Sequence, residues 1–324
     1  MRAWTRRAAL ALAASCLAGP SVLAQPAGFP TRAVTIVAGF PPGGTVDLLA
    51  RILAQRLTES WGQPVVVENR PGGSGIVASQ AVAAAAPDGH TLMVVPITHV
   101  TNASLVRLPY DPIADFTAVT LLAEQPMMLV VNNSLPIHSV ANLVAEARAR
   151  PGKLNCGSGG NGTSQHLACE LFKAMTGVDI AHVPYRGNAA AMTDVISGQI
   201  ELLFDQMATA VPHVRGGRVR ALAVSSAQRA PAMPNLPTIA EAGVPGYETT
   251  AWFGLVGPAR MPSDLTRRIQ GDAATALATP DVRDRLADQG LTLVTSPPEH
   301  FSAFLASEMA KWAEVIRKSG ARAE

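Results

Sequence analysis

The repeated order of short strand, glycine-rich turn and helix constrains the fold of this chain more than any other feature. Val34 to Ala38 is a β-branched run that leads through the turn Gly39 to Gly44 into an amphipathic segment, for which Thr45 is a natural N-cap. Similar turns lie at Asn69 to Gly75 and at Gly157 to Gly162. Strands that alternate with helices form mainly parallel sheets covered by helices on both faces, so the sequence predicts an α/β fold.

The length of 324 residues, of which 48% are hydrophobic, suggests two lobes. Leu121 to Val131 is rich in apolar and β-branched residues and is predicted to pass as a strand into a second lobe, and Arg220 to Ser225 is predicted to return to the first. We therefore expect residues 25–124 and 227–324 to form a discontinuous first lobe, and residues 125–226 to form the second.

The first 24 residues have the pattern of a secretory signal peptide. Arginines precede an apolar run from Ala8 to Ala18, and the small residues that follow fit cleavage after Ala24. The run is too short to span a bilayer, which predicts an exported, periplasmic protein. Three alternatives stay open: an uncleaved anchor, lipid attachment at Cys16, and export by the twin-arginine route.

The weak positive charge of the chain belongs to this N-terminal segment. Without residues 1–24, the count of Lys and Arg falls from 26 to 23 against 24 Asp and Glu, so the remaining chain is close to neutral. No cluster of basic and aromatic residues follows, which excludes a nucleic-acid partner, and no later apolar stretch is long enough to cross a membrane.

The glycine-rich turns lie where the carboxyl ends of parallel strands are expected, which is where open α/β sheets bind ligands. Glycine lets backbone N–H groups approach a ligand, and the helix that follows adds free N–H donors and a positive dipole end. A small carboxylate can be bound in this way without an arginine. Each turn taken singly is as well explained as a tight turn. The ligand-binding residues predicted on the turns are Phe40, Pro42, Gly43, Gly44, Thr45 and Ser74 in the first lobe, and Ser158, Gly159, Asn161, Gly162, Thr163 and Ser164 in the second.

Several other side chains near these turns have two explanations each. Asp47 is either a partner for an amine or hydroxyl on the ligand or a complement to its helix N-terminus, and Asp205 at a strand end is equally ambiguous. His166 lines the cleft or is a packed histidine. Tyr185 offers ring surface to a carbon skeleton or belongs to the core, and Arg186 and Gly187 follow it at the same edge.

Two enzyme-like patterns are weak. Gly157 to Gly162 matches the dinucleotide motif G-x-G-x-x-G, but the acidic residue expected at the end of the next strand is missing, because Asp179 precedes that strand instead. Ser74 and Ser158 lack the G-x-S-x-G frame of a hydrolase, and the histidines show no spacing typical of zinc ligands. The sequence therefore predicts no cofactor and no metal.

The motifs together resemble the Bug family, the periplasmic receptors of tripartite tricarboxylate transporters. The segments that carry the resemblance are Ile36 to Asp47 (IVAGFPPGGTVD), Glu68 to Gly72, Leu108 to Pro112, Gly157 to His166 (GSGGNGTSQH), His182 to Gly187 (HVPYRG), Leu203 to Asp205 and Leu236 to Gly243. The resemblance implies a type II periplasmic-binding-protein fold, whose two lobes close on a carboxylate. It also implies a monomeric receptor that delivers its ligand to membrane permease subunits. A sensory co-receptor and a secreted enzyme that uses Asp47, His166 or Asp205 are the alternatives.

Cys156 and Cys169 depart from the family pattern, in which an aromatic residue and a small residue are usual at these positions. They are the only cysteines after residue 24, one at the end of a strand and one on the helix that follows. In an oxidising compartment they either form a disulfide at the base of the ligand loop or remain two separate buried thiols.

Overall fold

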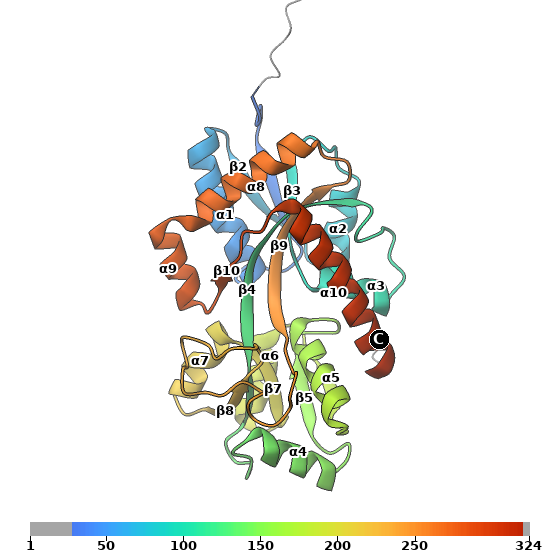
Figure 1. Cartoon of the computed structure of the whole chain (residues 1–324), viewed down its shortest axis with the longest axis vertical. Helices are drawn as coiled ribbons and strands as arrows, with labels where there is room; N and C mark the ends of the chain where they lie inside the picture. The colour runs from blue at the N-terminus through green and yellow to red at the C-terminus, as the bar shows by residue number, and fades with distance from the viewer. Residues whose placement is uncertain (1–27, 320–324) are drawn as a thin grey trace, which may run out of the picture.

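The computed structural model, which describes residues 28–319, is organised around one long strand that runs through two lobes (Figure 1). This strand is β4 (Phe116–Asn132). Its first part pairs with strands of lobe 1 and its last part, from Met127 to Asn132, pairs with strands of lobe 2. The predicted α/β fold with two lobes is confirmed. The predicted boundaries of the lobes, at residues 124/125 and 226/227, stay a prediction, and the predicted signal peptide and Cys16 lie outside the described residues.

Lobe 1 contains a sheet in the order β2-β1-β3-β9-β4. Its first three strands are parallel, whereas β9 runs antiparallel to both of its neighbours and β10 pairs with β4. The strands are β1 (Val34–Ala38), β2 (Val65–Asn69), β3 (Thr91–Pro96), β9 (Thr250–Pro258) and β10 (Thr292–Leu293). The helices are α1 (Thr45–Trp61), the short 3-10 helix η1 (Gly73–Gly75), α2 (Ile76–Ala83), α3 (Thr98–Leu105), α8 (Ser263–Ala278), α9 (Pro280–Asp288) and α10 (Pro298–Ser319).

Lobe 2 continues the sheet from β4 in the order β7-β5-β6, with β8 on the other side of β4. The strands are β5 (Asn155–Ser158), β6 (Ala181–Pro184), β7 (Leu202–Gln206) and β8 (Val219–Val224), and the helices are α4 (Val140–Ala149), α5 (Ser164–Thr176), α6 (Asn188–Ser197) and α7 (Met207–Arg215). Because β5 is parallel to β6 and β7, the loops that follow these three strands meet at one edge of the sheet. That edge faces lobe 1.

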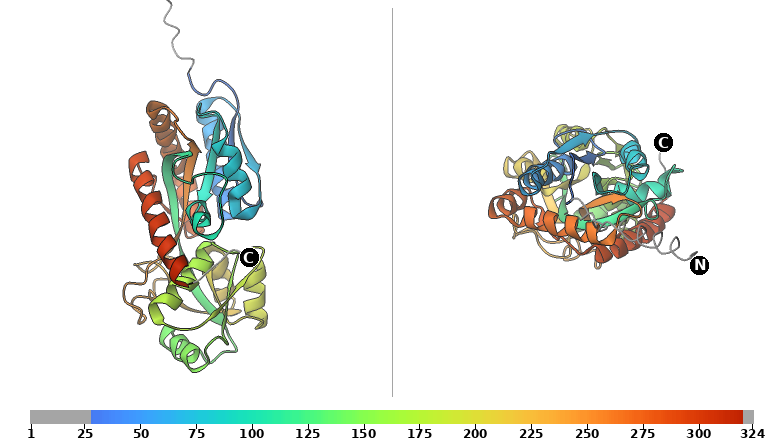
Figure 2. Two further views of the ribbon diagram at one scale, coloured as in Figure 1. Left: turned by 90° about the vertical axis from the view of Figure 1, so that its right-hand side faces the viewer. Right: turned by 90° about the horizontal axis from the view of Figure 1, so that it is seen from above.

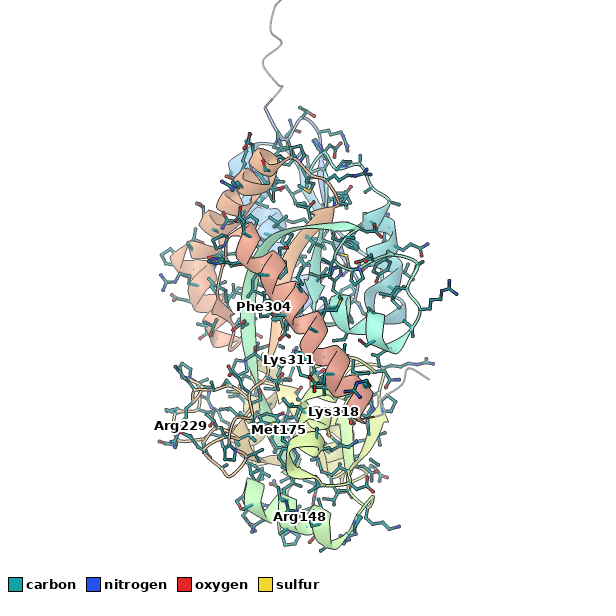
Figure 3. All side chains as sticks on the ribbon, turned by 45° about the vertical axis from the view of Figure 1, so that its right-hand side comes forward. Arg148, Met175, Arg229, Phe304, Lys311 and Lys318 are labelled. Carbon is teal, nitrogen blue, oxygen red and sulfur yellow. The ribbon has the colours of Figure 1, made fainter. Side chains whose placement is uncertain are left out.

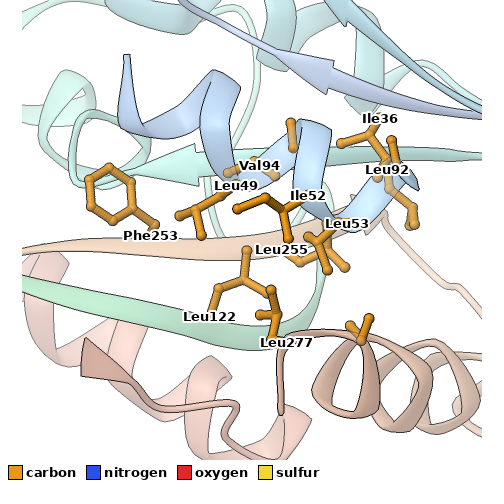
Figure 4. Packing of buried hydrophobic residues seen from close by; sticks show 14 of the residues in the cluster. Ile36, Leu49, Ile52, Leu53, Leu92, Val94, Leu122, Phe253, Leu255 and Leu277 are labelled. Atoms are coloured by element: carbon orange, nitrogen blue, oxygen red, sulfur yellow. The ribbon is translucent and has the colours of Figure 1, made fainter. Parts of the chain in front are cut away.

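Helix α1 illustrates how the apolar pattern places a helix on the sheet. Leu49, Leu53 and Leu57 recur at four-residue spacing and are fully buried in one cluster with residues of α8 (Figure 4). Burial of each leucine side chain contributes about 1.5–3 kcal/mol. The N-terminus of α1 is thereby held at the carboxyl end of β1, which is the edge of lobe 1 that faces lobe 2.

Helix α10 connects the two lobes on the outside. In lobe 1, the indole N–H groups of Trp312 on α10 and Trp252 on β9 both donate to Glu308 Oε2, at 2.7 and 2.8 Å. Apolar side chains of α10 also pack in one cluster with Leu167 of α5 in lobe 2. Figure 2 shows the helix reaching from the sheet of lobe 1 down to lobe 2, and Figure 3 labels Phe304, Lys311 and Lys318 along it. None of the helices between residues 28 and 319 is both long and apolar enough to cross a bilayer.

Candidate ligand-binding site

A cavity of about 190 Å³ lies between the facing edges of the two lobes. Its walls combine apolar rings with backbone at the starts of helices. Among the described residues, no Asp, Glu, Lys, Arg or His side chain lines it. The lining residues are Phe40, Gly44, Thr45, Val46, Pro96, Ile97, Thr98 and Phe253 from lobe 1, and Gly159, Thr163, Ser164, Gln165, Gly187, Asn188 and Gln206 from lobe 2.

The first residues or N-caps of α1, α3, α5, α6 and α7 all line this cavity. None of these helices has a side-chain hydrogen bond from its N-cap, and the same is true of α2, α8 and α9, whose starts do not line the cavity. Helix α4 is capped by Ser139 Oγ, which accepts the backbone N–H of Asn142 at 3.1 Å. Free N–H donors and positive dipole ends from both lobes therefore point toward one space. Such an arrangement favours an anion.

Two threonines at helix starts make no capping hydrogen bond, and for Thr45 this differs from the prediction made from the sequence. Thr45 is the first residue of α1 instead, and its hydroxyl donates to Gln206 Oε1 of lobe 2 at 3.3 Å. Thr163 stands at the N-cap of α5, but its hydroxyl donates to the carbonyl of Gly160 at 2.7 Å. Both hydroxyls therefore bind other partners and leave the first N–H groups of α1 and α5 without a side-chain cap.

The ligand loop, residues 158–164, rests on a buried polar layer. Ser158 is fully buried; its Oγ accepts the backbone N–H of Gly160 at 3.1 Å and lies 2.7 Å from His182 Nε2. His166, 2% exposed, accepts the backbone N–H of Gly162 at Nδ1, at 3.0 Å. Ser158 and His166 were predicted to bind ligand, but they lie under the loop and do not line the cavity.

Burial holds three histidines neutral. It lowers the pKa of His166 to about 3, with nearby His182 and Lys173 lowering it further, and it lowers the pKa of His182 to about 4 together with Lys173. In lobe 1, burial lowers the pKa of His99 to about 4, although the bond from its ring to the carbonyl of Pro112 opposes this. Each of these side chains takes up a proton in the unfolded chain at a higher pH than in the folded protein.

We expect the protein to lose stability as the pH falls from about 6.5 toward 4. A histidine whose folded pKa is depressed contributes stability above its unfolded pKa, and each one loses about 1.4 kcal/mol per pH unit as the unfolded chain binds the proton first. Asp205 acts in the opposite direction, because burial raises its pKa to about 6. Urea unfolding at pH 7, 6 and 5 measures the slope, and a free energy of unfolding that stays level over this range would contradict the expectation.

Two buried carboxylates that were predicted to bind ligand instead accept hydrogen bonds from residues at the site. Asp47 accepts hydrogen bonds from the backbone of Gly43, from Arg51 and from Asn69, at 3.0, 2.9 and 2.9 Å. Burial raises the pKa of Asp47, but these bonds outweigh it and leave the pKa below its ordinary value. Asp205 is fully buried and accepts from Gln206 N, Thr209 Oγ1 and Asn188 Nδ2, so Asn188 and not Asp205 reaches the cavity.

The other predicted residues divide into two groups. Phe40, Gly44, Thr45, Gly159, Thr163, Ser164 and Gly187 line the cavity. Pro42, Gly43, Ser74, Asn161, Gly162, Tyr185 and Arg186 do not. Tyr185 donates its hydroxyl to Asp194 at 2.7 Å, and burial together with this bond raises its pKa to about 12. Gly162 meets lobe 1, because its carbonyl accepts the hydroxyl of Thr101 at 3.0 Å.

The structure does not contain a disulfide between Cys156 and Cys169. Both are free thiols, fully buried in the apolar core of lobe 2 and in contact with each other. Burial raises the pKa of Cys156 well above its ordinary value, which keeps the thiol protonated and unreactive. Of the two alternatives that the sequence left open, the structure has two separate buried thiols.

Sequence reasoning missed about half of the lining. The missed residues are Val46, Pro96, Ile97, Thr98, Gln165, Asn188, Gln206 and Phe253. The rule that ligands bind beyond the carboxyl ends of strands could have found four of them. Pro96 and Gln206 are the last residues of β3 and β7, and Ile97 and Thr98 directly follow β3. Phe253 lies inside β9, away from any strand-to-helix turn, and carries no such signal. Among residues 28–319, no group of three or more His, Cys, Asp or Glu side chains could hold a metal ion.

Comparison with known proteins agrees with this geometry. Residues 49–321 match the family model described as the tripartite tricarboxylate transporter family receptor. The chain is 34% identical to the protein BugT of Bordetella pertussis, over 91% of each chain. This confirms the resemblance to the Bug family.

Solved structures of relatives have the same two-lobe fold. The structure of R. palustris Rpa4515 with adipate is 40% identical in sequence and superposes with a TM-score of 0.83. The match covers 91% of this chain and 100% of Rpa4515. MatC from Rhodopseudomonas palustris with bound malate is 34% identical, with a TM-score of 0.80 and coverage of 89% and 100%. The chain therefore belongs to the tripartite tricarboxylate transporter receptor family, whose members are periplasmic solute-binding receptors rather than enzymes.

Proposed function

We propose that this receptor captures a small dicarboxylate between its two lobes and delivers it to the membrane subunits of a tripartite transporter. One observation carries the proposal: the N-termini of helices from both lobes meet at a cavity that no charged side chain lines among the described residues. In such a site the ligand supplies the negative charge, and the backbone supplies the donors.

The loop at Gly44 and Thr45 in lobe 1 and the ligand loop in lobe 2 hold one carboxylate from opposite sides. The start of α6, at Asn188, is available for a second carboxylate. Phe40, Phe253 and Ile97 provide apolar surface for the carbon chain between the two. The relatives found with adipate and malate support a dicarboxylate of this size.

The cavity favours an organic acid over an amino acid. An ammonium group is matched by an acidic side chain or by several carbonyl acceptors. Asp47 and Asp205, which directly follow and precede the lining residues Val46 and Gln206, are already hydrogen-bonded by other groups. An ammonium group would therefore meet no negatively charged partner on the described lining, where the acceptors are neutral, such as Asn188 Oδ1, which has no hydrogen-bond partner.

The binding proposal is tested by thermal unfolding in the presence of ligands of matched length. Adipate at about 100 times its dissociation constant is expected to stabilise the folded protein by about 2.7 kcal/mol, and the unfolding temperature is expected to rise further with concentration. Adipamide and 1,6-diaminohexane, which have the same chain with no charge or positive charge, are expected to have no effect. Stabilisation by the diamine or by a sugar, with none by any carboxylate, would refute the proposal.

Delivery is tested separately from binding. Proteoliposomes that contain the membrane subunits are expected to take up labelled ligand only when this protein is added on the outside. Binding without any stimulation of uptake would favour the sensory co-receptor alternative. An exported protein, cleaved after Ala24, and closure of the lobes around the ligand are part of the same proposal.

A further inference from the structure

His166 and His182 form a buried pair under the ligand loop that the binding site itself does not use. Their rings stack at 3.8 Å between centroids with an interplanar angle of 15°. His166 is the third residue of α5, and His182 lies on β6. The pair therefore connects this helix to a strand of the lobe 2 sheet. Two stacked imidazole rings repel each other when both are charged, so this geometry disfavours the state in which both rings carry an extra proton.

Each ring makes one hydrogen bond to the ligand loop. His166 Nδ1 accepts the backbone N–H of Gly162 at 3.0 Å, which places the ring proton on Nε2, 3.8 Å from Glu170 Oε1. Lys173 Nζ holds the same carboxylate oxygen of Glu170 at 2.7 Å. Nδ1 of His166 is thus committed to a single acceptor role.

The second bond fixes the first residue of the loop. Ser158 Oγ accepts the N–H of Gly160 at 3.1 Å and lies 2.7 Å from His182 Nε2. The Ser158 hydroxyl also lies 3.1 Å from the carbonyl of Gly160, which already accepts the Thr163 hydroxyl at 2.7 Å, so we assign the Ser158 proton to its shorter contact, with His182 Nε2. The chain of contacts therefore runs from His182 through Ser158 to the backbone of Gly160.

The Gly162 peptide connects this layer to the other lobe. Its N–H is bound by His166, and its carbonyl accepts Thr101 Oγ1 from α3 of lobe 1 at 3.0 Å. A glycine in this segment is free to rotate unless its peptide is held. The N–H and the carbonyl of Gly162 belong to successive peptide planes, so His166 holds the first plane and Thr101 the second, and the two bonds together restrict the backbone torsions of Gly162.

We propose that His166 and His182 are positioning residues: as neutral hydrogen-bond acceptors they hold the ligand loop in the conformation in which Gly159, Thr163 and Ser164 line the cavity and the Gly162 carbonyl meets Thr101. The proposal rests on the binding function proposed above. It predicts that the acceptor nitrogen, more than the packing of the ring, determines ligand affinity.

Paired substitutions separate the acceptor from the ring. His166→Phe keeps an aromatic ring in the stack and removes the acceptor, whereas His166→Asn loses the ring and keeps an acceptor oxygen at the place of Nδ1. For His182 the equivalent pair is His182→Phe and His182→Gln, since the Gln side chain ends near the place of Nε2. His90→Phe is the control. Like the two histidines of the pair, His90 is buried, contacts another ring, that of Phe29, and accepts a backbone N–H, from Thr31 at 3.3 Å. Unlike them, it lies just before β3, at the edge of lobe 1 away from the cavity.

The first measurement needs no ligand. Amide hydrogen exchange of the peptide that contains residues 158–164 is expected to become at least about tenfold faster in His166→Phe and in His182→Phe, and to stay unchanged in His90→Phe. Unchanged exchange in both ring-retaining variants would overturn the proposal, whatever the ligand proves to be.

The second measurement uses adipate in calorimetric titration. The dissociation constant is expected to rise at least about 30-fold in His166→Phe and to stay within about fivefold of the wild type in His166→Asn. Equal losses in the Phe and Asn variants would mean that the ring only packs, and would overturn the positioning role. If the wild type binds no carboxylate, the proposed ligand is wrong, and the exchange measurement still decides the role of the histidines.

Discussion

Replacement of Gly162 with alanine is expected to raise the dissociation constant for the carboxylate ligand at least about 100-fold, which corresponds to about 2.7 kcal/mol. Gly162 has a φ of 74°, and a methyl group on it would lie 2.6 Å from Leu105 Cδ1 and 3.3 Å from Thr101 Oγ1. Both neighbours belong to α3 of lobe 1, so the methyl group would separate the ligand loop from the other lobe. The proposed closure around the ligand would then be prevented.

The matched control for this substitution is Gly177→Ala. Gly162 lies just before α5, and Gly177 lies at the C-terminal end of that helix. Gly177 is the C-cap of α5 with a φ of 68°, and a methyl group there meets nothing within 4 Å. Both variants bear the cost of left-handed backbone, about 1–2 kcal/mol in the free energy of unfolding. Only Gly162→Ala is expected to lose affinity in calorimetric titration. Similar affinities for the two variants would show that the ligand loop does not need this approach to α3.

Gly254→Ala is expected to cause the largest loss of stability, about 3 kcal/mol or more, because it overpacks a core without room. Gly254 lies in β9, and a methyl group on it would be 2.0 Å from Phe301 Cζ and under 3 Å from two further ring carbons. Phe301 is fully buried on α10, beside the indole of Trp252. The helix would have to move away from the crossing strand, which would loosen its contact with both lobes.

Gly271→Ala provides the contrast, with the same change of one methyl group. Gly271 is inside α8, and a methyl group there meets nothing within 4 Å. Alanine is expected to stabilise the protein by about 0.5–1 kcal/mol, because glycine costs that much in the middle of a helix. Urea unfolding of the two variants measures both effects, and a loss of stability in Gly254→Ala no larger than about 0.5 kcal/mol would contradict the packing argument.

The order of the elements followed from the local pattern of the sequence. The β-branched run at Val34 to Ala38 is β1 to the residue, and the turn after it leads into α1. The predicted crossing segment from Leu121 lies inside β4, which is longer in both directions. Hydrophobic periodicity is read from near neighbours in the chain, so it identifies an element well and its ends less well.

The site was predicted at the level of loops and not of side chains. Gly44, Thr45, Gly159 and Ser164 line the cavity because the strand-to-helix turns that carry them lie at the edges where the two lobes face each other. His166 and Asp205, by contrast, are adjacent in sequence to lining residues and yet are buried behind them. Whether a polar side chain turns toward the cavity or toward the core depends on which partner it meets, and those partners are distant in the chain.

The sequence by itself determined the alternation of strands and helices, the glycine-rich turns and the family, since each depends on short contiguous segments. Only the tertiary structure decided which groups meet the ligand space. Asn188, at the start of α6, lines it while its amide is held by Asp205 of β7, and the hydroxyl of Thr45 is directed to the other lobe by Gln206, 161 residues later in the chain. Hydrogen bonds between different elements leave no periodic signal, because they depend on how those elements are placed within a lobe, as for Asn188 and Asp205, or between the lobes, as for Thr45 and Gln206.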